Sequence, residues 1–179
     1  FKKRNGKFLF SIRYKYLIFL LYEELKKFFA NQNQFFPVII MNKILVVDDD
    51  PVILESLKNI LSKAKYHVTA TGNPLEAIHL YETDPTNVVI SDLLMPEMSG
   101  KDFMLKLYES GHKPLVIVLT MMNDSRTIID LFKSGAHDYI IKPFSSNELV
   151  MKVNKAYELA ELRILNENLQ KEREIRFEH

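Results

Sequence analysis

Carboxylates, a threonine and a lysine stand at the ends of short apolar runs, and together they could carry out phosphoryl chemistry. Asp48 and Asp49 follow the first run, Asp92 the third, Thr120 the fourth and Lys142 the fifth. A carboxylate can act as a nucleophile and form an aspartyl phosphate. An ammonium neutralises charge on the transferred group, and a hydroxyl can hydrogen-bond one of its oxygens. The residue types therefore predict Asp92 as nucleophile, Lys142 as ammonium and Thr120 as hydroxyl.

The clustered carboxylates also predict a metal ion. Several carboxylates in one pocket repel one another, so a positive charge is expected among them. The chain has no Cys, and an all-oxygen ligand set favours a hard cation. Mg²⁺ accepts one or two carboxylates, keeps waters of its own and binds phosphate oxygens. We therefore expect a magnesium site at these residues.

Each of these residues also has a simpler explanation on its own. Asp50 before Pro51 suits a helix N-cap, and Asp92 could form a turn. Thr120 could cap a strand end, and Lys142 could lie on the surface. The joint pattern favours the chemical interpretation, because four separate runs each end in a residue that one mechanism requires.

The elements that must position these residues follow from hydrophobic periodicity. From residue 42 onward, short apolar runs rich in β-branched residues alternate with amphipathic stretches, which predicts an α/β fold. Such alternation implies right-handed crossovers and a five-stranded, doubly wound parallel sheet of (βα)5, flavodoxin-like type. In such a sheet the ligand site lies at the carboxyl ends of the strands. The predicted strands are residues 44–47, 68–70, 88–90, 115–119 and 139–141.

Helix boundaries are marked by residues with strong capping preferences. The predicted boundary residues are Asp50, Asn73, Gly100, Asn123 or Asp124, and Gly135. The first helix is expected to bury an apolar face made of Val52, Ile53, Leu57, Ile60, Leu61 and Ala64. The fifth helix has no Gly or Pro to stop it from Ser145 to the end of the sequence, so a long C-terminal helix is predicted.

Net charge divides the 179 residues into three segments. The formal net charge of +1 combines +6 in residues 1–41, −4 in residues 42–160 and −1 in residues 161–179. The acidic middle segment argues against direct nucleic-acid binding, which needs clustered Lys and Arg. Cytoplasmic localisation is expected for this cysteine-free chain.

The two extensions are interpreted differently. Residues 1–41 are predicted to be non-native or upstream sequence before Met41, with a membrane-contacting helix as the alternative. Their apolar core is too short for a bilayer span, and membrane contact is not expected. Residues 161–179 are predicted to be a helical extension, either a coiled coil or a linker to an output domain; the alternative to a dimeric coil is a solvated helix that frays past about residue 165. The leucines considered for the coil are Leu159, Leu162, Leu165 and Leu169.

The motifs in the middle segment resemble the receiver domain of two-component response regulators, the CheY-like superfamily. The run of residues 44–51 resembles the family's first strand and acidic pair. Residues 92–100 resemble its D-x-x-M-P-x-M-x-G phosphorylation loop, which is a highly specific motif. Residues 118–120 and 138–144 resemble its threonine and lysine segments. The resemblance spans residue 43 to about residue 160.

The resemblance implies roles for individual residues. Asp92 would accept a phosphoryl group from a sensor histidine kinase or phosphotransfer protein. Mg²⁺ would be bound by Asp49, Asp92 and the backbone carbonyl of Leu94, with Asp48 acting largely through water. Thr120 would move toward the phosphoryl group.

A conformational switch is also implied by the resemblance. Tyr139 would turn inward as the face made by the fourth helix, fifth strand and fifth helix rearranges to control an output or partner. That face or the C-terminal helix could form a homodimer. The Lys142-Pro143 peptide bond would be cis. The domain would catalyse its own phosphorylation and dephosphorylation while serving mainly as a signalling switch.

Three apolar residues depart from common family patterns. Met121 stands where a small residue is usual, and Leu94 and Met122 stand where some members carry polar groups that orient the hydrolytic water. Slow self-dephosphorylation is therefore expected. Two alternatives remain open: an interaction module that keeps the fold without using the chemistry, and a haloacid-dehalogenase-like phosphatase with Asp48 as nucleophile.

Overall fold

Five parallel strands form a single sheet in the computed structural model, which describes residues 42–111 and 113–177. The strands lie in the order β2-β1-β3-β4-β5, as expected for a doubly wound sheet. Residues 1–41, for which leader and membrane-contact roles were considered, lie outside the described residues. The strands are β1 (Lys43–Val47), β2 (His67–Thr71), β3 (Val88–Asp92), β4 (Leu115–Thr120) and β5 (Asp138–Ile141).

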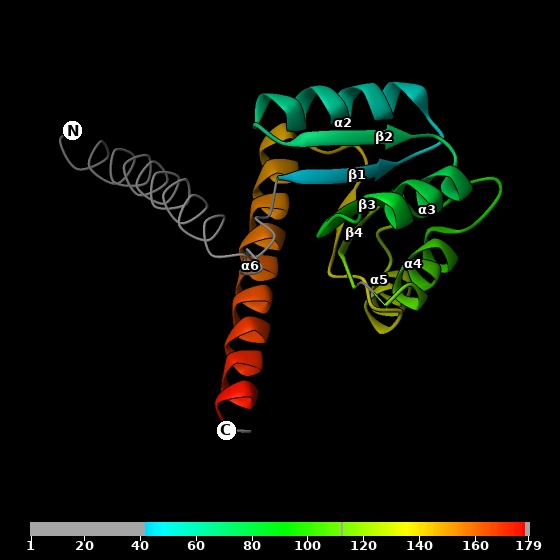
Figure 1. Ribbon diagram of the computed structural model, residues 1–179. Helices are drawn as coiled ribbons and strands as arrows, with labels where there is room; N and C mark the ends of the chain where they lie inside the picture. Colours follow the sequence, from blue (N-terminus) through cyan, green and yellow to red (C-terminus); the bar gives the residue numbers. More distant parts are fainter. Residues whose placement is uncertain (1–41, 112, 178–179) are drawn as a thin grey trace, which may run out of the picture. The chain divides into compact units, whose positions relative to one another are not determined.

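Helices cover both faces of the sheet, and each one follows a strand (Figure 1). One layer contains α2 and α6, whose apolar side chains share a buried cluster with one side of the strands. The other layer contains α3, α4 and α5, which share a second cluster with the opposite side. The helices are α2 (Pro51–Lys63), α3 (Pro74–Thr83), α4 (Gly100–Glu109), α5 (Ser125–Lys133) and α6 (Ser146–Phe177).

The burial of each strand explains its composition. All residues of β3 and β4 are buried, and four of the five in β1 are, because helices cover these central strands on both sides. The edge strands β2 and β5 contain exposed or half-buried residues. The predicted α/β fold and long C-terminal helix are confirmed, and no helix in the described part of the chain is long and apolar enough to cross a membrane.

Local capping works largely as the sequence predicts. The Asp50 carboxylate accepts hydrogen bonds from the amides of Val52 and Ile53, and Asn73 and Asp124 cap α3 and α5 in the same way. One expectation was wrong: Val52 is 73% exposed and does not belong to the buried face of α2. Its position in the first turn, beside the exposed cap, points it into solvent.

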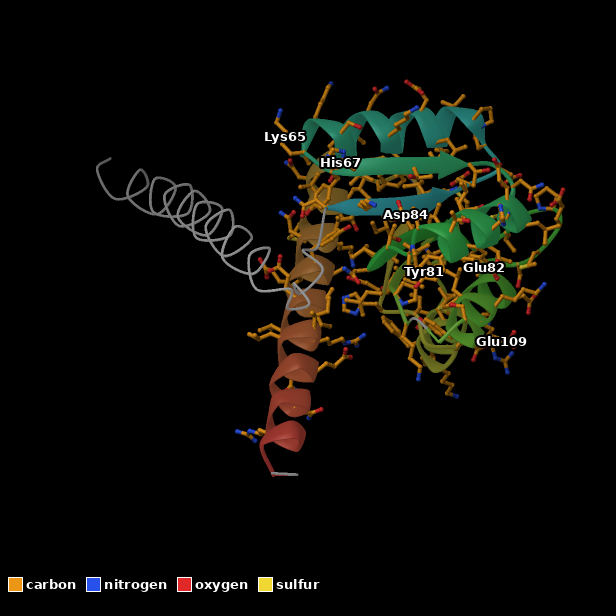
Figure 2. All side chains as sticks on the ribbon, in the orientation of Figure 1. Lys65, His67, Tyr81, Glu82, Asp84 and Glu109 are labelled. Atoms are coloured by element: carbon orange, nitrogen blue, oxygen red, sulfur yellow. The ribbon has the colours of Figure 1, made fainter. Side chains whose placement is uncertain are left out.

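Two helices end in the same hydrogen-bonded turn but with different residues in the left-handed position. After α5, Gly135 has φ +100, and the Ala136 amide reaches back to the Leu131 carbonyl. After α2, Lys65, which is labelled in Figure 2, has φ 71, and the Tyr66 amide donates to the Leu61 carbonyl. A Cβ atom is disfavoured at positive φ, so the turn at Lys65 carries backbone strain that the turn at Gly135 avoids.

Candidate functional site

The candidate site lies where the chain changes from one layer of helices to the other. Strands β1 and β3 are neighbours, but β1 leads into α2 on one face and β3 leads toward α4 on the opposite face. The two connections diverge at the carboxyl ends of the strands, where sheets of this type bind their ligands. Asp48 and Asp49 directly follow β1, and Asp92 is the last residue of β3.

Three carboxylates meet at this edge of the sheet. Asp48, Asp49 and Asp92 each offer an oxygen atom within 4.8 Å of the others. The Asp48 side chain is fully buried, the Asp92 side chain is 13% exposed, and Asp49 is exposed. The cluster is thus buried at Asp48 and open to solvent at Asp49. An all-oxygen donor set with solvent access fits a hard divalent cation that retains water ligands, so the residues present suit Mg²⁺.

Lys142, which is 94 positions away from Asp48 in the sequence, contacts two of these carboxylates. It follows β5, and its Nζ lies 2.6 Å from Asp48 Oδ2 and 3.0 Å from Asp92 Oδ1. Only 11% of the lysine side chain is exposed. The other Asp48 oxygen accepts a hydrogen bond of 3.0 Å from the Asp50 amide. Both oxygens of the most buried carboxylate therefore have protein donors.

Burial and charge act in opposite directions on these groups. Burial raises the pKa of Asp48 above its ordinary value, although the hydrogen bonds from Lys142 and from the Asp50 amide partly oppose the shift. For Lys142 burial lowers the pKa, but hydrogen bonds and charges from Asp48 and Asp92 outweigh it, so the net shift is upward. The lysine is therefore held charged. Three carboxylates face one ammonium, and the site keeps an excess of negative charge that a cation would relieve.

The main chain at Asp92 is held by close contacts that the sequence did not reveal. The Leu93 amide donates to the Leu119 carbonyl over 2.9 Å, and the Gly100 amide donates to the Leu93 carbonyl over 2.8 Å. The Ser91 hydroxyl donates to the Asp92 carbonyl over 2.9 Å. A Cβ atom added to Gly100 would lie 2.2 Å from the Asp92 carbonyl oxygen.

Gly100 was predicted as a helix boundary and as the last residue of the motif at residues 92–100; it is the first residue of α4, and Ser99 supplies the cap. Its φ angle is not positive, so close approach and not backbone conformation explains the glycine. The available sequence signal was a glycine at the start of a helix, at a position where alanine would form the helix better. Only the tertiary structure reveals that Gly100 packs closely against the backbone of Asp92.

The two predicted switch residues occupy different surroundings. Thr120 ends β4, is 1% exposed and accepts a 3.0 Å hydrogen bond from the Met122 amide through its hydroxyl oxygen. Tyr139 lies apart from the acidic cluster, on β5 between α5 and α6. Its ring meets Phe132 edge-on with centroids 5.9 Å apart, and Lys152 Nζ lies 5.4 Å from its centroid.

Three apolar side chains are exposed in the loops that follow β3 and β4: Leu94 comes two residues after Asp92, and Met121 and Met122 directly follow Thr120. Leu94 is 62% exposed, Met121 70% and Met122 43%. The predicted cis peptide bond between Lys142 and Pro143 is present. Four of the predicted site residues converge, namely Asp48, Asp49, Asp92 and Lys142, whereas Tyr139 lies beside Phe132 and Lys152.

Comparison with known proteins agrees with this geometry. The model of the response regulator receiver domain family matches residues 44–154. The transcriptional regulatory protein SrrA of Staphylococcus aureus is 37% identical over 112 residues, which cover 63% of this chain and 46% of SrrA. The chain thus spans about half the length of the curated relatives it matches.

Solved structures show the same fold. The receiver domain of the Francisella response regulator 1452 is 32% identical, with a TM-score of 0.62 over 65% of this chain and 96% of that one. The beryllofluoride-activated NtrC4 receiver domain dimer is 30% identical, with a TM-score of 0.64 over 67% and 99% of the two chains. The family match covers more than half of the sequence and includes every residue of the acidic cluster. This chain belongs to the response regulator receiver domain family of two-component signal transduction.

Proposed function

We propose that Asp92 accepts a phosphoryl group from a phosphohistidine of a sensor histidine kinase or phosphotransfer protein. The observation that carries the proposal is the position of Asp92, which is partly accessible and has Lys142 Nζ 3.0 Å from one of its oxygens. An attack by the Asp92 carboxylate on phosphorus forms the O–P bond while the N–P bond of the phosphohistidine breaks. Lys142 would neutralise charge on the transferred group, and the Thr120 hydroxyl would bind one of its oxygens.

Mg²⁺ fits this reaction as the resident cation. Asp49, Asp92 and the backbone carbonyl of Leu94 would bind the ion directly, and Asp48 would act largely through water. The burial of Asp48 and its bond to Lys142 support this indirect role. When bound, the ion supplies positive charge that stabilises the phosphoryl oxygens. Asp48 itself keeps Lys142 charged and in place.

Signal output is proposed to pass through the face made by α5, β5 and α6. Movement of Thr120 toward the phosphoryl group would release space at β4, and inward rotation of Tyr139 would repack that face. Tyr139 now contacts Phe132 of α5 and Lys152 of α6, so its rotation would change both helices. The receiver is proposed to span residues 42–160, with residues 161–179 as a connector to an output domain or partner in the cytoplasm.

Mass spectrometry after incubation with acetyl phosphate and Mg²⁺ tests the proposal. We expect one covalent phosphate, located on Asp92, and none in the Asp92→Asn variant. Phosphate on Asp48 would instead indicate a phosphatase-like nucleophile, and no incorporation in the wild type would favour a passive interaction module. The variant removes one charge at a partly accessible position, so circular dichroism is expected to show an unchanged fold.

A further inference from the structure

Helix α6 has two opposite faces with different character. Successive residues of an α-helix are separated by about 100° around its axis, so residues three or four positions apart lie on the same side. The buried face packs on the sheet through Leu149, Val153, Ala156, Tyr157 and Ala160. The opposite face, which we name the outer stripe, consists of Met151, Lys155, Glu158, Leu162 and Leu165, all exposed.

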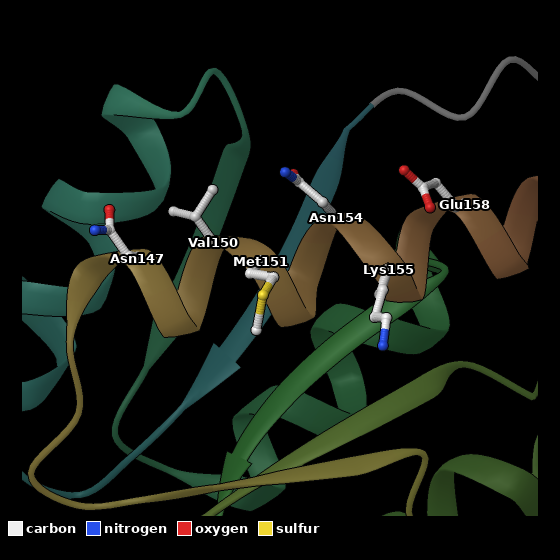
Figure 3. Close-up of a pocket in the computed structure, with 6 residues that line it drawn as sticks. All are labelled: Asn147, Val150, Met151, Asn154, Lys155 and Glu158. Atoms are coloured by element: carbon white, nitrogen blue, oxygen red, sulfur yellow. The ribbon is translucent and has the colours of Figure 1, made fainter. Parts of the chain in front are cut away.

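The outer stripe has the spacing of a helix-pairing surface. The spacing between its successive members alternates between four and three residues, as it does between the a and d positions of a heptad. Met151 is 57% exposed, Leu162 62% and Leu165 56%, which is unusual for large apolar side chains on one line. Leu159, considered for the same coil from the sequence, packs instead against the core. Among the described residues, Met151, Lys155 and Glu158 help to line a pocket on the surface of α6 (Figure 3).

The two charges within the stripe decide how a second helix would run. In a parallel pair each residue faces its own copy, so Lys155 would face a lysine and Glu158 a glutamate. In an antiparallel pair with a two-fold axis between residues 156 and 157, Lys155 faces Glu158 of the partner subunit. The same register places Met151 against the partner's Leu162. No ion pair within the described part of the chain involves Lys155 or Glu158, so both are available.

We propose that the outer stripe of α6 is a docking surface for a second copy of this chain, in antiparallel orientation. The contact is isologous, because each residue and its counterpart occur on both protomers. It shares no residue with the acidic cluster and does not rest on the proposed phosphoryl transfer. One helix pair buries less than the ~1,600 Å² of a standard stable interface, so the dimer is weak.

Cysteine cross-linking of the full chain tests the orientation, since the protein has no Cys of its own. A mixture of the Met151→Cys and Leu162→Cys variants is expected to form a disulfide-linked dimer between the two variants. Either variant alone is expected to form no disulfide-linked dimer, because the two identical positions would lie about 16 Å apart along the helix axis, beyond the reach of a disulfide. Cross-linking of the single variants would indicate parallel pairing and overturn the proposal.

Sedimentation equilibrium tests the charge pairing. Lys155→Glu is expected to weaken dimerisation at least tenfold, and adding Glu158→Lys is expected to restore it. Leu105→Glu alters a residue of α4 that is 49% exposed, and it serves as a control that leaves association unchanged. A wild-type chain that stays monomeric at high concentration would overturn the proposal. A dimer insensitive to Lys155→Glu would do the same and would indicate the face made by α5, β5 and α6.

Discussion

Polar side chains are paired at the amino end of the parallel sheet, whereas those at its carboxyl end carry an excess of negative charge. At the amino end, polar groups pair off: Lys43 forms a 2.8 Å ion pair with Asp84, and the Tyr66 hydroxyl donates to Asn154 over 2.6 Å. The Tyr157 hydroxyl donates to the Lys43 carbonyl. At the carboxyl end, three carboxylates lie together and the Lys142 ammonium pairs with two of them, so the charge is not balanced.

This difference separates stability from chemistry. Burial, followed by the charges of Glu161 and Glu158, raises the pKa of Tyr66 to about 12, so its hydroxyl stays neutral. The hydrogen bond from this hydroxyl to Asn154 links the residue before β2 to α6. At the other end, repulsion among the carboxylates lowers the folding stability, but the excess negative charge allows the site to bind a cation, which in turn binds a phosphoryl group. Substitutions at the carboxyl end should therefore change phosphorylation, and substitutions at the amino end should change only stability.

Loss of Lys142 should have the largest effect. Lys142→Met removes the ammonium that contacts both Asp48 and Asp92, and phosphorylation by acetyl phosphate should slow by about 10²- to 10³-fold, as for loss of one charge-stabilising donor. Lys43→Met, which breaks an ion pair at the amino end, should leave the rate unchanged. Rates are measured by mass spectrometry. Equal effects of the two variants would abolish the distinction between the two ends.

Gly100→Ala should be the next most severe change. The added methyl must displace the Asp92 carbonyl, which it would approach to 2.2 Å, so phosphorylation should slow by up to about 10²-fold through misplacement of the nucleophile.

Two matched glycines separate this positional effect from instability. Gly72→Ala adds a methyl at an ordinary 3.6 Å from the Asp48 carbonyl and should be tolerated. Gly135→Ala, at φ +100, should cost about 1–2 kcal/mol of folding stability without slowing phosphorylation. If Gly100→Ala lowers stability but phosphorylates at the normal rate, Gly100 does not position Asp92.

Polar residues in the exposed loops should shorten the lifetime of the phosphorylated form. Leu94→Asn combined with Met122→Glu introduces groups that can orient a water molecule, and decay should quicken by about tenfold, or ~1.4 kcal/mol of barrier. Decay is followed after removal of the phosphodonor. Leu105→Asn, another exposed apolar position, is the control. An unchanged decay would mean that the apolar loops do not limit hydrolysis.

Relief of strain at the amino end should stabilise the protein slightly. Lys65→Gly removes a Cβ from a residue with φ 71, and the gain should exceed the entropy cost of glycine by about 0.5–1 kcal/mol. The melting temperature should rise by about 1–4 °C, while phosphorylation stays unchanged. Lys65→Ala keeps the Cβ and should give no such gain, so equal melting temperatures of the two variants would contradict the assignment of strain.

The smallest effect expected is a pH dependence from His137, just before β5. Burial lowers its pKa below the ordinary 6.5, with Arg163, Lys152 and Lys155 also lowering it and Asp138 opposing. As pH falls through about 6.5, the unfolded chain takes up a proton before the folded chain does, so stability declines. The urea concentration at the midpoint of unfolding should differ less between pH 7.5 and pH 5.5 in the His137→Gln variant than in the wild type. A steeper dependence in the variant would show that the sign is wrong.

Much of this molecule is determined by the sequence alone. The strand runs, the caps at Asp50 and Asn73 and the uninterrupted α6 all depend on neighbours within about four residues, which a sequence displays directly. The identity of the carboxylates and their positions at strand ends were equally visible. Local periodicity and capping are therefore sufficient for the fold class and the candidate residues.

Only the tertiary structure decided how those residues meet. Lys142 reaches Asp48 across 94 positions of sequence, and this contact depends on strand order and on both layers of helices packing at once. The same packing exposes Val52 and brings Gly100 against the Asp92 carbonyl. It also separates Tyr139 from the acidic cluster. Periodicity describes one element at a time, whereas burial, close approach and shared charge arise between elements.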